Sequence, residues 1–288
     1  MDPATSFSSL PPELVTKICA DPDLSKEDLI ALRLTSKSQG IYLSASKELG
    51  KRYFKKINLV YTRYSLQAFV EICKNPAFGP AVRAVGFSYA RFLPDWSVED
   101  NKARLAELRS RRGYLDNIRL LVNRRDEEEE LKNLGDAEDI LAAAFTSLSH
   151  WRRPLSLTVS SSESHALGLE RIWSPEYIGG DPHWACDVIG TIRLLCHAAT
   201  RGTCVVQRLR VYGFVWNLVD SSCGSLSKAQ LSELSLSIRV AGFPSIAQVA
   251  GLDDMVTKLL KNAVHLKTLR LENLDLDDHY YLHRPFQE

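Results

Sequence analysis

The residues of this sequence that could perform chemistry are few and scattered. His279 and His283 lie four residues apart, a spacing that on a helix would place both imidazoles on one face for a metal ion. Cys196 and His197, with Cys204 nearby, are the residue types of an activated thiol but lack tetrahedral ligand spacing. We interpret the histidine pair as part of a solvated tail and Cys196 as a buried thiol. The aspartates beside the histidine pair are Asp275, Asp277 and Asp278.

The sequence lacks the common catalytic signatures. G-x-x-x-x-G-K-[ST], G-x-G-x-x-G, G-x-S-x-G and H-E-x-x-H do not occur in it. We therefore predict that the chain is not an enzyme and uses no metal or other cofactor. The competing class, an enzyme of another kind, would require a deep pocket lined by convergent polar groups.

The charge balance argues against a polyanionic partner for the whole chain. The 288 residues include 36 Lys and Arg and 35 Asp and Glu, which gives a net charge of +1. Lys47, Lys51 and Lys55 form a basic stripe at helical spacing, which we interpret as a solvated helix face. The longest stretch without charged residues, 240–252, is too short to cross a bilayer. We predict neither a nucleic acid nor a membrane as partner.

The cysteines indicate a reducing compartment. They are scattered, form no C-x-x-C pair and occur in a sequence without an N-x-[ST] glycosylation site. The first residues also lack the basic start and apolar run of a secretory signal. We therefore expect free thiols and a cytoplasmic or nuclear location. The six cysteines are Cys19, Cys73, Cys186, Cys196, Cys204 and Cys223.

The first sixty residues predict three short helices. Pro11 and Pro12 fit a first helical turn, where the missing N–H groups cost nothing, and the stretch 21–23 ends this helix. Ser25 and Asp28 have the spacing of a capping box and predict the start of a second helix. A third helix is expected over 36–54.

After Lys56 the pattern changes to short β-like runs that alternate with helices. Helical spacing is found after Asp136, over 184–200 and over 245–262. Strands that alternate with helices predict an α/β fold with a mostly parallel sheet, with α+β as the alternative. The candidate strands are Ile57–Tyr61, Val82–Ser88, Leu155–Ser160, Val206–Tyr212, Leu234–Arg239 and Leu269–Glu272.

Three of these strand regions share the apolar spacing L-x-x-L-x-L of a leucine-rich repeat. The ninth position holds no Asn or Cys, and the starts at 206, 231 and 266 are unevenly spaced. We therefore predict an irregular, leucine-rich-repeat-like solenoid. Its equivalent positions are Val206, Leu209 and Val211; Leu231, Leu234 and Leu236; and Leu266, Leu269 and Leu271.

A charged segment interrupts the second part of the chain. Residues 97–134 are dense in Arg and Glu and poor in large apolar side chains, so we interpret them as a solvated helical insertion or linker. The predicted organisation is thus a helical unit over 1–56 and an α/β region over 57–288 that contains the insertion.

The helical unit resembles the F-box family. The residues that carry the resemblance are Leu10-Pro11-Pro12-Glu13-Leu14 and, at the matching distance, Asp28-Leu29-Ile30-Ala31-Leu32-Arg33-Leu34-Thr35-Ser36-Lys37. Residues 53–59 and 75–83 also look like segments that follow the F-box in many fungal F-box proteins. The resemblance covers about the first ninety residues.

This resemblance implies a docking function for the helical unit. F-box proteins bind the Skp adaptor of SCF-type cullin-RING ubiquitin ligases through this module, and the rest of the chain captures the protein to be ubiquitinated. A unit of this size cannot bury all its leucines, so some should face a partner. By position, the expected contacts are Leu10, Pro11, Leu14, Ile18, Leu29, Leu32, Leu34, Ser36 and Lys37.

The client surface is expected on the strands of the solenoid. Arg210 and Tyr212 alternate on one strand and so point to the same face, and Arg239 and Arg270 on later strands could extend the patch. We predict a substrate-recognition adaptor that reaches a cullin through the Skp adaptor and binds a protein client. The alternative is an F-box scaffold that acts outside any ubiquitin ligase.

Overall fold

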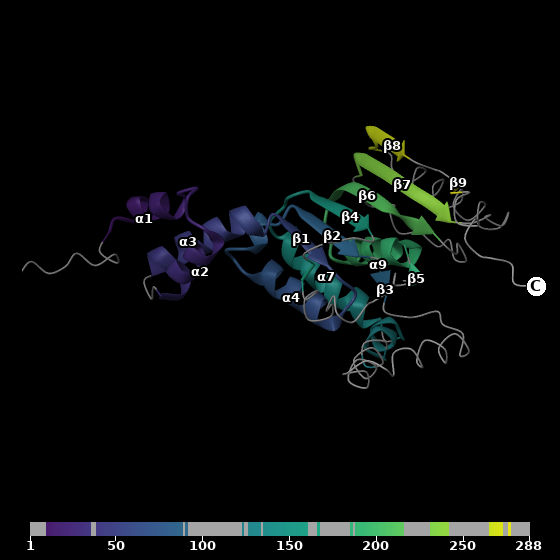
Figure 1. Cartoon of the computed structure of the whole chain (residues 1–288), viewed down its shortest axis with the longest axis horizontal. Helices are drawn as coiled ribbons and strands as arrows, with labels where there is room; N and C mark the ends of the chain where they lie inside the picture. The colour runs from purple at the N-terminus through teal and green to yellow at the C-terminus, as the bar shows by residue number, and fades with distance from the viewer. Residues whose placement is uncertain are drawn as a thin grey trace, which may run out of the picture.

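The computed structural model shows a parallel sheet with helices on one face and a three-helix unit at one end (Figure 1). The prediction of an α/β chain with a parallel sheet is confirmed. The structure describes residues 10–35, 39–88, 90–91, 123, 126–133, 135–160, 166–167, 185–186, 188–215, 231–241, 265–272 and 276–277.

The three-helix unit consists of α1 (Pro12–Cys19), α2 (Lys26–Thr35) and α3 (Gln39–Tyr53), and both α1 and α2 pack on α3. Pro12 opens α1, as predicted. The capping box is confirmed, because the Asp28 N–H donates to Ser25 Oγ and the Ser25 N–H donates to Asp28 Oδ2, both over 3.0 Å.

The sheet runs β1-β2-β4-β6-β7-β8, so its strand order follows the chain order, and every pair along it is parallel. Strand β9 (Leu276–Asp277) also pairs with β7. A separate antiparallel pair joins β3 (Ala90–Arg91) to β5 (Ala185–Cys186). The bounds of the six strands are β1 Lys56–Leu59, β2 Ala84–Ser88, β4 Leu155–Ser160, β6 Val206–Val215, β7 Glu233–Ala241 and β8 Thr268–Glu272.

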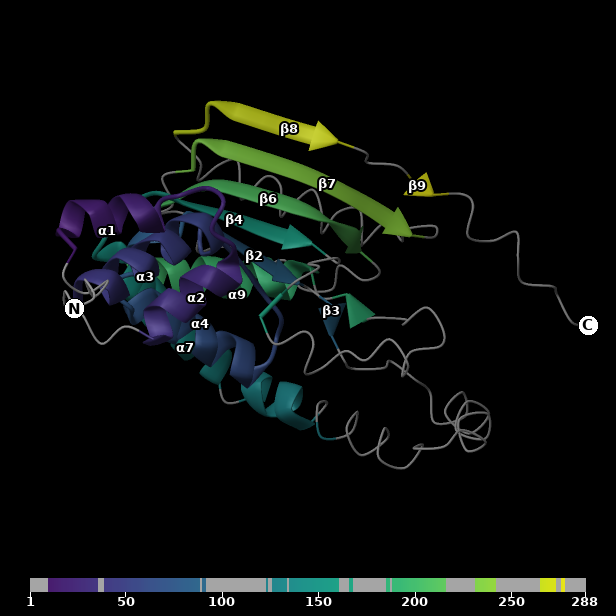
Figure 2. The same cartoon turned by 60° about the vertical axis from the view of Figure 1, so that its left-hand side comes forward.

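Three helices lie side by side on one face of the sheet: α4 (Arg63–Lys74), α7 (Asp136–Ser149) and α9 (Val188–Arg201) (Figure 2). Side chains alternate between the two faces along each strand, so every second one points toward these helices. Across the sheet from β1 to β7, the side chains that point to the helices form a row of buried apolar residues. That row is Ile57, Val85, Leu157, Leu209 and Leu234. The short helix η2 (Gly79–Ala81) leads from α4 to β2.

The strand register pairs several of the residues that share the repeated leucine spacing. Leu209 lies opposite Leu234, and Leu234 lies opposite Leu269. The next inward position repeats the alignment, with Val211 opposite Leu236. These equivalent positions of the later strands are therefore neighbours in the sheet.

Part of the charged segment belongs to the core, which corrects the solvated interpretation for its last turns. Residues 126–133 are helical, Leu131 is completely buried and Glu128 is nearly so. A single leucine among many charged residues gives little helical periodicity in the sequence, so the burial of Leu131 was not predicted. Most of 97–125 and the predicted helix over 245–262 lie outside the described residues.

The sequence pattern did not identify α4 as a separate helix. The Ser65 N–H donates to the side chain of Thr62, which caps the start of α4, and the helix buries its own Leu66, Phe69 and Cys73 in the main core. Within the described ranges, no helix combines the length and the apolar character that a membrane crossing requires.

Candidate docking surfaces

The three-helix unit has a small core of its own. The buried side chains are Val15 and Cys19 from α1, Leu29 from α2, and Ile41, Ala45 and Leu49 from α3. The three residues of α3 are buried together because they are four positions apart and so lie on one face of the helix. Leu29, which was expected at the partner surface, is 0% exposed and stabilises this core instead.

Two apolar side chains of α1 face solvent one helical turn apart. Leu14 is 48% exposed and Ile18 is 37% exposed. Because α1 turns Val15 and Cys19 toward the core, residues 14 and 18 fall on its other apolar flank. On α2, Leu34 is 74% exposed. These side chains are the candidate docking surface of the unit.

Apolar exposure is concentrated in the three-helix unit. Among the described residues, six of the ten exposed large hydrophobic side chains belong to it, although it is the smaller part of the fold. Tyr42 and Leu43 of α3 are among them and were not expected as contacts. The sequence indicates their exposure only in that α3 carries more apolar residues than one helix face can bury.

The other expected docking residues divide by burial. Pro11 is exposed, whereas Leu10 and Leu32 are half-buried against the core of the unit. Ser36 and Lys37 lie outside the described residues. Leu14, Ile18 and Leu34 are therefore the expected contacts that a partner can reach most fully.

The unit is joined to the sheet without a linker. α3 ends at Tyr53 and β1 begins at Lys56. Phe54 stacks on Phe78 with ring centroids 4.4 Å apart. The guanidinium of Arg33 lies 5.1 Å from the centroid of the Phe78 ring. Arg33 also lies 5.3 Å from the Tyr42 ring. A cation–π and aromatic stack therefore connects α2 and α3 to the segment before β2.

Arg52 fastens the loop between α1 and α2. Its Nη2 donates to the carbonyl of Asp21 over 2.7 Å, and its Nη1 donates to the carbonyl of Leu24 over 3.0 Å. Its Nε donates to Glu48 over 2.7 Å, and this hydrogen bond raises the pKa of the guanidinium. The arginine thus holds α1 in position relative to α3.

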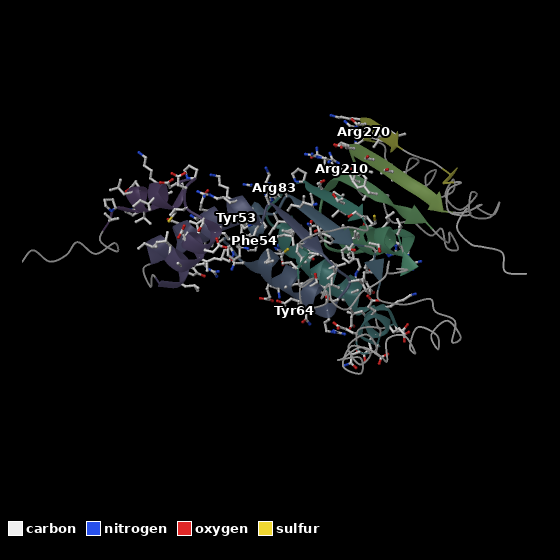
Figure 3. The ribbon with its side chains drawn as sticks, in the orientation of Figure 1. Tyr53, Phe54, Tyr64, Arg83, Arg210 and Arg270 are labelled. Atoms are coloured by element: carbon white, nitrogen blue, oxygen red, sulfur yellow. The ribbon has the colours of Figure 1, made fainter. Side chains whose placement is uncertain are left out.

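Arg210, Tyr212 and Arg270 lie on the polar face of the sheet, which we define by the row Asn58, Gly86, Thr158, Arg210, Ser235 and Arg270. Arg210 Nη2 lies 2.9 Å from Glu233 Oε1, and this pairing raises the pKa of Arg210. Tyr212 is exposed, and Arg270 is exposed two strands from Arg210 (Figure 3). The side chain of Arg239 lies outside the described part.

The thiols are buried rather than activated. Cys19, Cys73, Cys196 and Cys204 are buried and form no disulfide. Burial raises the pKa of Cys204 to about 11 and also raises that of Cys73, so both thiols are protonated at neutral pH. Within the described ranges, no group of three or more potential metal ligands comes together. The predicted histidine pair lies outside those ranges.

Comparisons of the chain with protein-family models, with curated proteins and with solved structures found no match. The exposed apolar side chains of the three-helix unit and the charged groups of the sheet are therefore the observations from which a function can be proposed.

Proposed function

We propose that this chain is a substrate-recognition adaptor of an SCF-type ubiquitin ligase, in which residues 10–53 dock on the Skp adaptor as an F-box does. The observation that carries the proposal is the exposure of Leu14 and Ile18, one turn apart on α1, in the motif that resembles the F-box. The α/β region then captures a protein client.

The energetics of the unit favour a partner. Leu14 and Leu34 keep about half or more of their surface in water, although the unit already has a core. Covering apolar surface contributes about 25 cal/mol per Å², so each of these side chains would add ~1–2 kcal/mol in a complex. A few such side chains at the centre of an interface supply much of the affinity of a typical complex.

The join between the two parts suits an adaptor, because a ligase must hold its client at a fixed place. Phe54 and Phe78 connect α3 to the segment before β2, and Phe54 also packs against the main core. The sequential parallel order of the strands supports a leucine-rich-repeat-like arrangement, with Arg210, Tyr212 and Arg270 offered to the client from the polar face.

Co-purification from cells tests this function. We expect the tagged chain to recover the Skp adaptor together with a cullin, and Leu14→Asp to lose both. Tyr64→Asp is the matched control, because it also places a carboxylate at an exposed apolar side chain but lies on α4. Recovery of the adaptor without a cullin would favour the scaffold function, and recovery of neither would contradict docking.

A further inference from the structure

Among the described residues, acidic side chains gather near one edge of the sheet and basic side chains near the other. The acidic residues of 126–130 lie near the carboxyl end of β1, since Glu127 Oε1 accepts the N–H of Arg63 at the start of α4. Asp136 lies at the same edge, 2.7 Å from the guanidinium of Arg63. The opposite edge, where the strands begin, carries cations. We call it the amino edge; its cations among the described residues are Lys55, Arg83, Arg153, Arg208 and Lys267, and it also carries Glu233, whose Oε2 lies 3.9 Å from Arg208 Nε.

Backbone hydrogen bonds hold the starts of neighbouring strands side by side. The Arg83 N–H donates to the carbonyl of Lys55, and the Ser156 N–H donates to the carbonyl of Arg83. On the far strands, the Lys267 N–H donates to the carbonyl of Ser232. Because parallel strands all begin at the same edge, basic residues that precede each strand are brought together. The sequence carried this signal, since Lys55, Arg83 and Arg153 each come just before a strand.

Two guanidinium groups converge at the centre of this edge. Arg83 Nη1 donates to the carbonyl of Pro80 over 2.6 Å, and Arg153 Nη1 approaches the same oxygen at 3.5 Å. Because they share this oxygen, the two nitrogens lie within roughly 6 Å of one another, where like charges repel and an anion bound beside the pair is favoured. No carboxylate of the described residues lies within ion-pair distance of either guanidinium.

Arg83 is held in place for such a ligand. Its Nη1 donates to two backbone carbonyls, those of Pro80 and Val82, which fixes the plane of the guanidinium. Its remaining N–H groups have no partner among the described residues. A fixed guanidinium with free N–H groups binds a carboxylate or phosphate with two parallel hydrogen bonds at little entropic cost.

We propose that the amino edge binds a short acidic segment of a protein partner, with Arg83 and Arg153 as the central anion contacts. Strands lie about 4.8 Å apart, so the edge from β1 to β8 spans roughly 24 Å, the length of about seven extended residues. That reach and the acidic opposite edge favour a short acidic peptide over a long nucleic acid. The proposal does not depend on docking of the three-helix unit on an adaptor.

Fluorescence polarisation with the full chain tests the proposal. The probes are a labelled Glu-Ser repeat peptide of twelve residues, the same peptide with phosphoserine, a Gln-Ser peptide, and a single-stranded RNA of twelve nucleotides. We expect the acidic peptides to bind at low salt, with the Gln-Ser peptide at least tenfold weaker. Tighter binding of the phosphoserine peptide would identify phosphate as the preferred anion, and equal binding would identify the carboxylates as sufficient.

The double variant Arg83→Gln/Arg153→Gln should bind the acidic peptides at least tenfold more weakly. Lys17→Gln/Lys132→Gln is the control, because it removes two exposed cations elsewhere and should bind as the wild type does. Arg153→Gln alone, at an exposed side chain, keeps the test valid if the double variant unfolds, and should weaken binding about threefold or more. Binding that is absent, unchanged in these variants, or weaker than that of the RNA would overturn the proposal.

Discussion

The rings of Phe54 and Phe78 stack face to face, with centroids 4.4 Å apart and planes 4° apart. Phe54 follows the last helix of the three-helix unit and Phe78 precedes β2, so the pair joins parts that the sequence separates by a helix and a strand. Phe78 is also buried in the core of the unit, while Phe54 packs against both cores. The two parts are thus held together by shared packing, with no flexible segment between them.

Removal of Phe78 should weaken this connection. Phe78→Ala takes away a buried ring and its stack with Phe54, so we expect the free energy of unfolding to fall by about 3–5 kcal/mol. Urea denaturation measures this loss. Tyr64→Ala is the control at an exposed aromatic side chain and should cost less than about 1 kcal/mol. Equal losses in both variants would show that the stack does not stabilise the fold.

Gly50 allows α3 to approach the segment before β2. A Cβ at this position would lie 2.6 Å from the carbonyl oxygen of Ala77, which is closer than van der Waals contact allows. Gly→Ala within a helix ordinarily stabilises by about 1 kcal/mol, but here we expect Gly50→Ala to lower the melting temperature. Gly40→Ala, at an exposed position in the same helix, should leave it unchanged or raise it. A rise in both variants would contradict the close approach.

Leu29 and Leu34 of α2 should separate stability from docking. Leu29 is fully buried, so Leu29→Ala should cost about 2–5 kcal/mol of unfolding free energy. Leu34 is mostly exposed, so Leu34→Ala should cost less than about 1 kcal/mol while it weakens binding to a partner. Chemical denaturation of the two variants checks the contrast. A large loss of stability in Leu34→Ala would place that side chain in the core rather than at the docking surface.

The buried thiols predict how stability depends on pH. The pKa of Cys204 is raised to about 11 in the folded chain, whereas the unfolded thiol keeps a pKa near 9. Below pH 9 both states hold the proton and the full stability is present; above it the unfolded state loses the proton first, so stability falls as the pH rises toward 11. The loss from this thiol should approach about 3 kcal/mol.

Urea denaturation at pH 7.5 and 10.5 measures this dependence. Cys204→Ala is the control, because it removes the thiol and should lose less stability between the two pH values than the wild type does. An identical loss in the variant would show that Cys204 does not contribute to the pH dependence.

Much of the fold could be predicted from the sequence because local signals agreed with the packing. The capping box at Ser25 and Asp28 marked the start of α2, and the apolar run at Leu155–Ser160 coincides with β4. The equivalent leucines, such as Leu209 and Leu234, became partners in the sheet because the strands are parallel and in register.

The connection between the two parts could not be predicted, because stacking depends on the path of the backbone. Nothing in the spacing of Phe54 and Phe78 indicates that their rings meet. The sequence also could not predict that Leu29 is buried while Leu34 is exposed. Both residues fit the apolar pattern of α2, and only the packing of α2 on α3 determines which of them is buried. The convergence of Arg83 and Arg153 also depends on the position of a single carbonyl, that of Pro80.

The most direct test of the proposed function is the affinity of the purified chain for a purified Skp-family adaptor, measured by titration calorimetry. We predict a saturable one-to-one complex that Leu14→Asp weakens by about tenfold or more, while Tyr64→Asp binds as the wild type does. The absence of a complex with the folded wild-type chain, or equal affinity of the wild type and Leu14→Asp, would contradict the account.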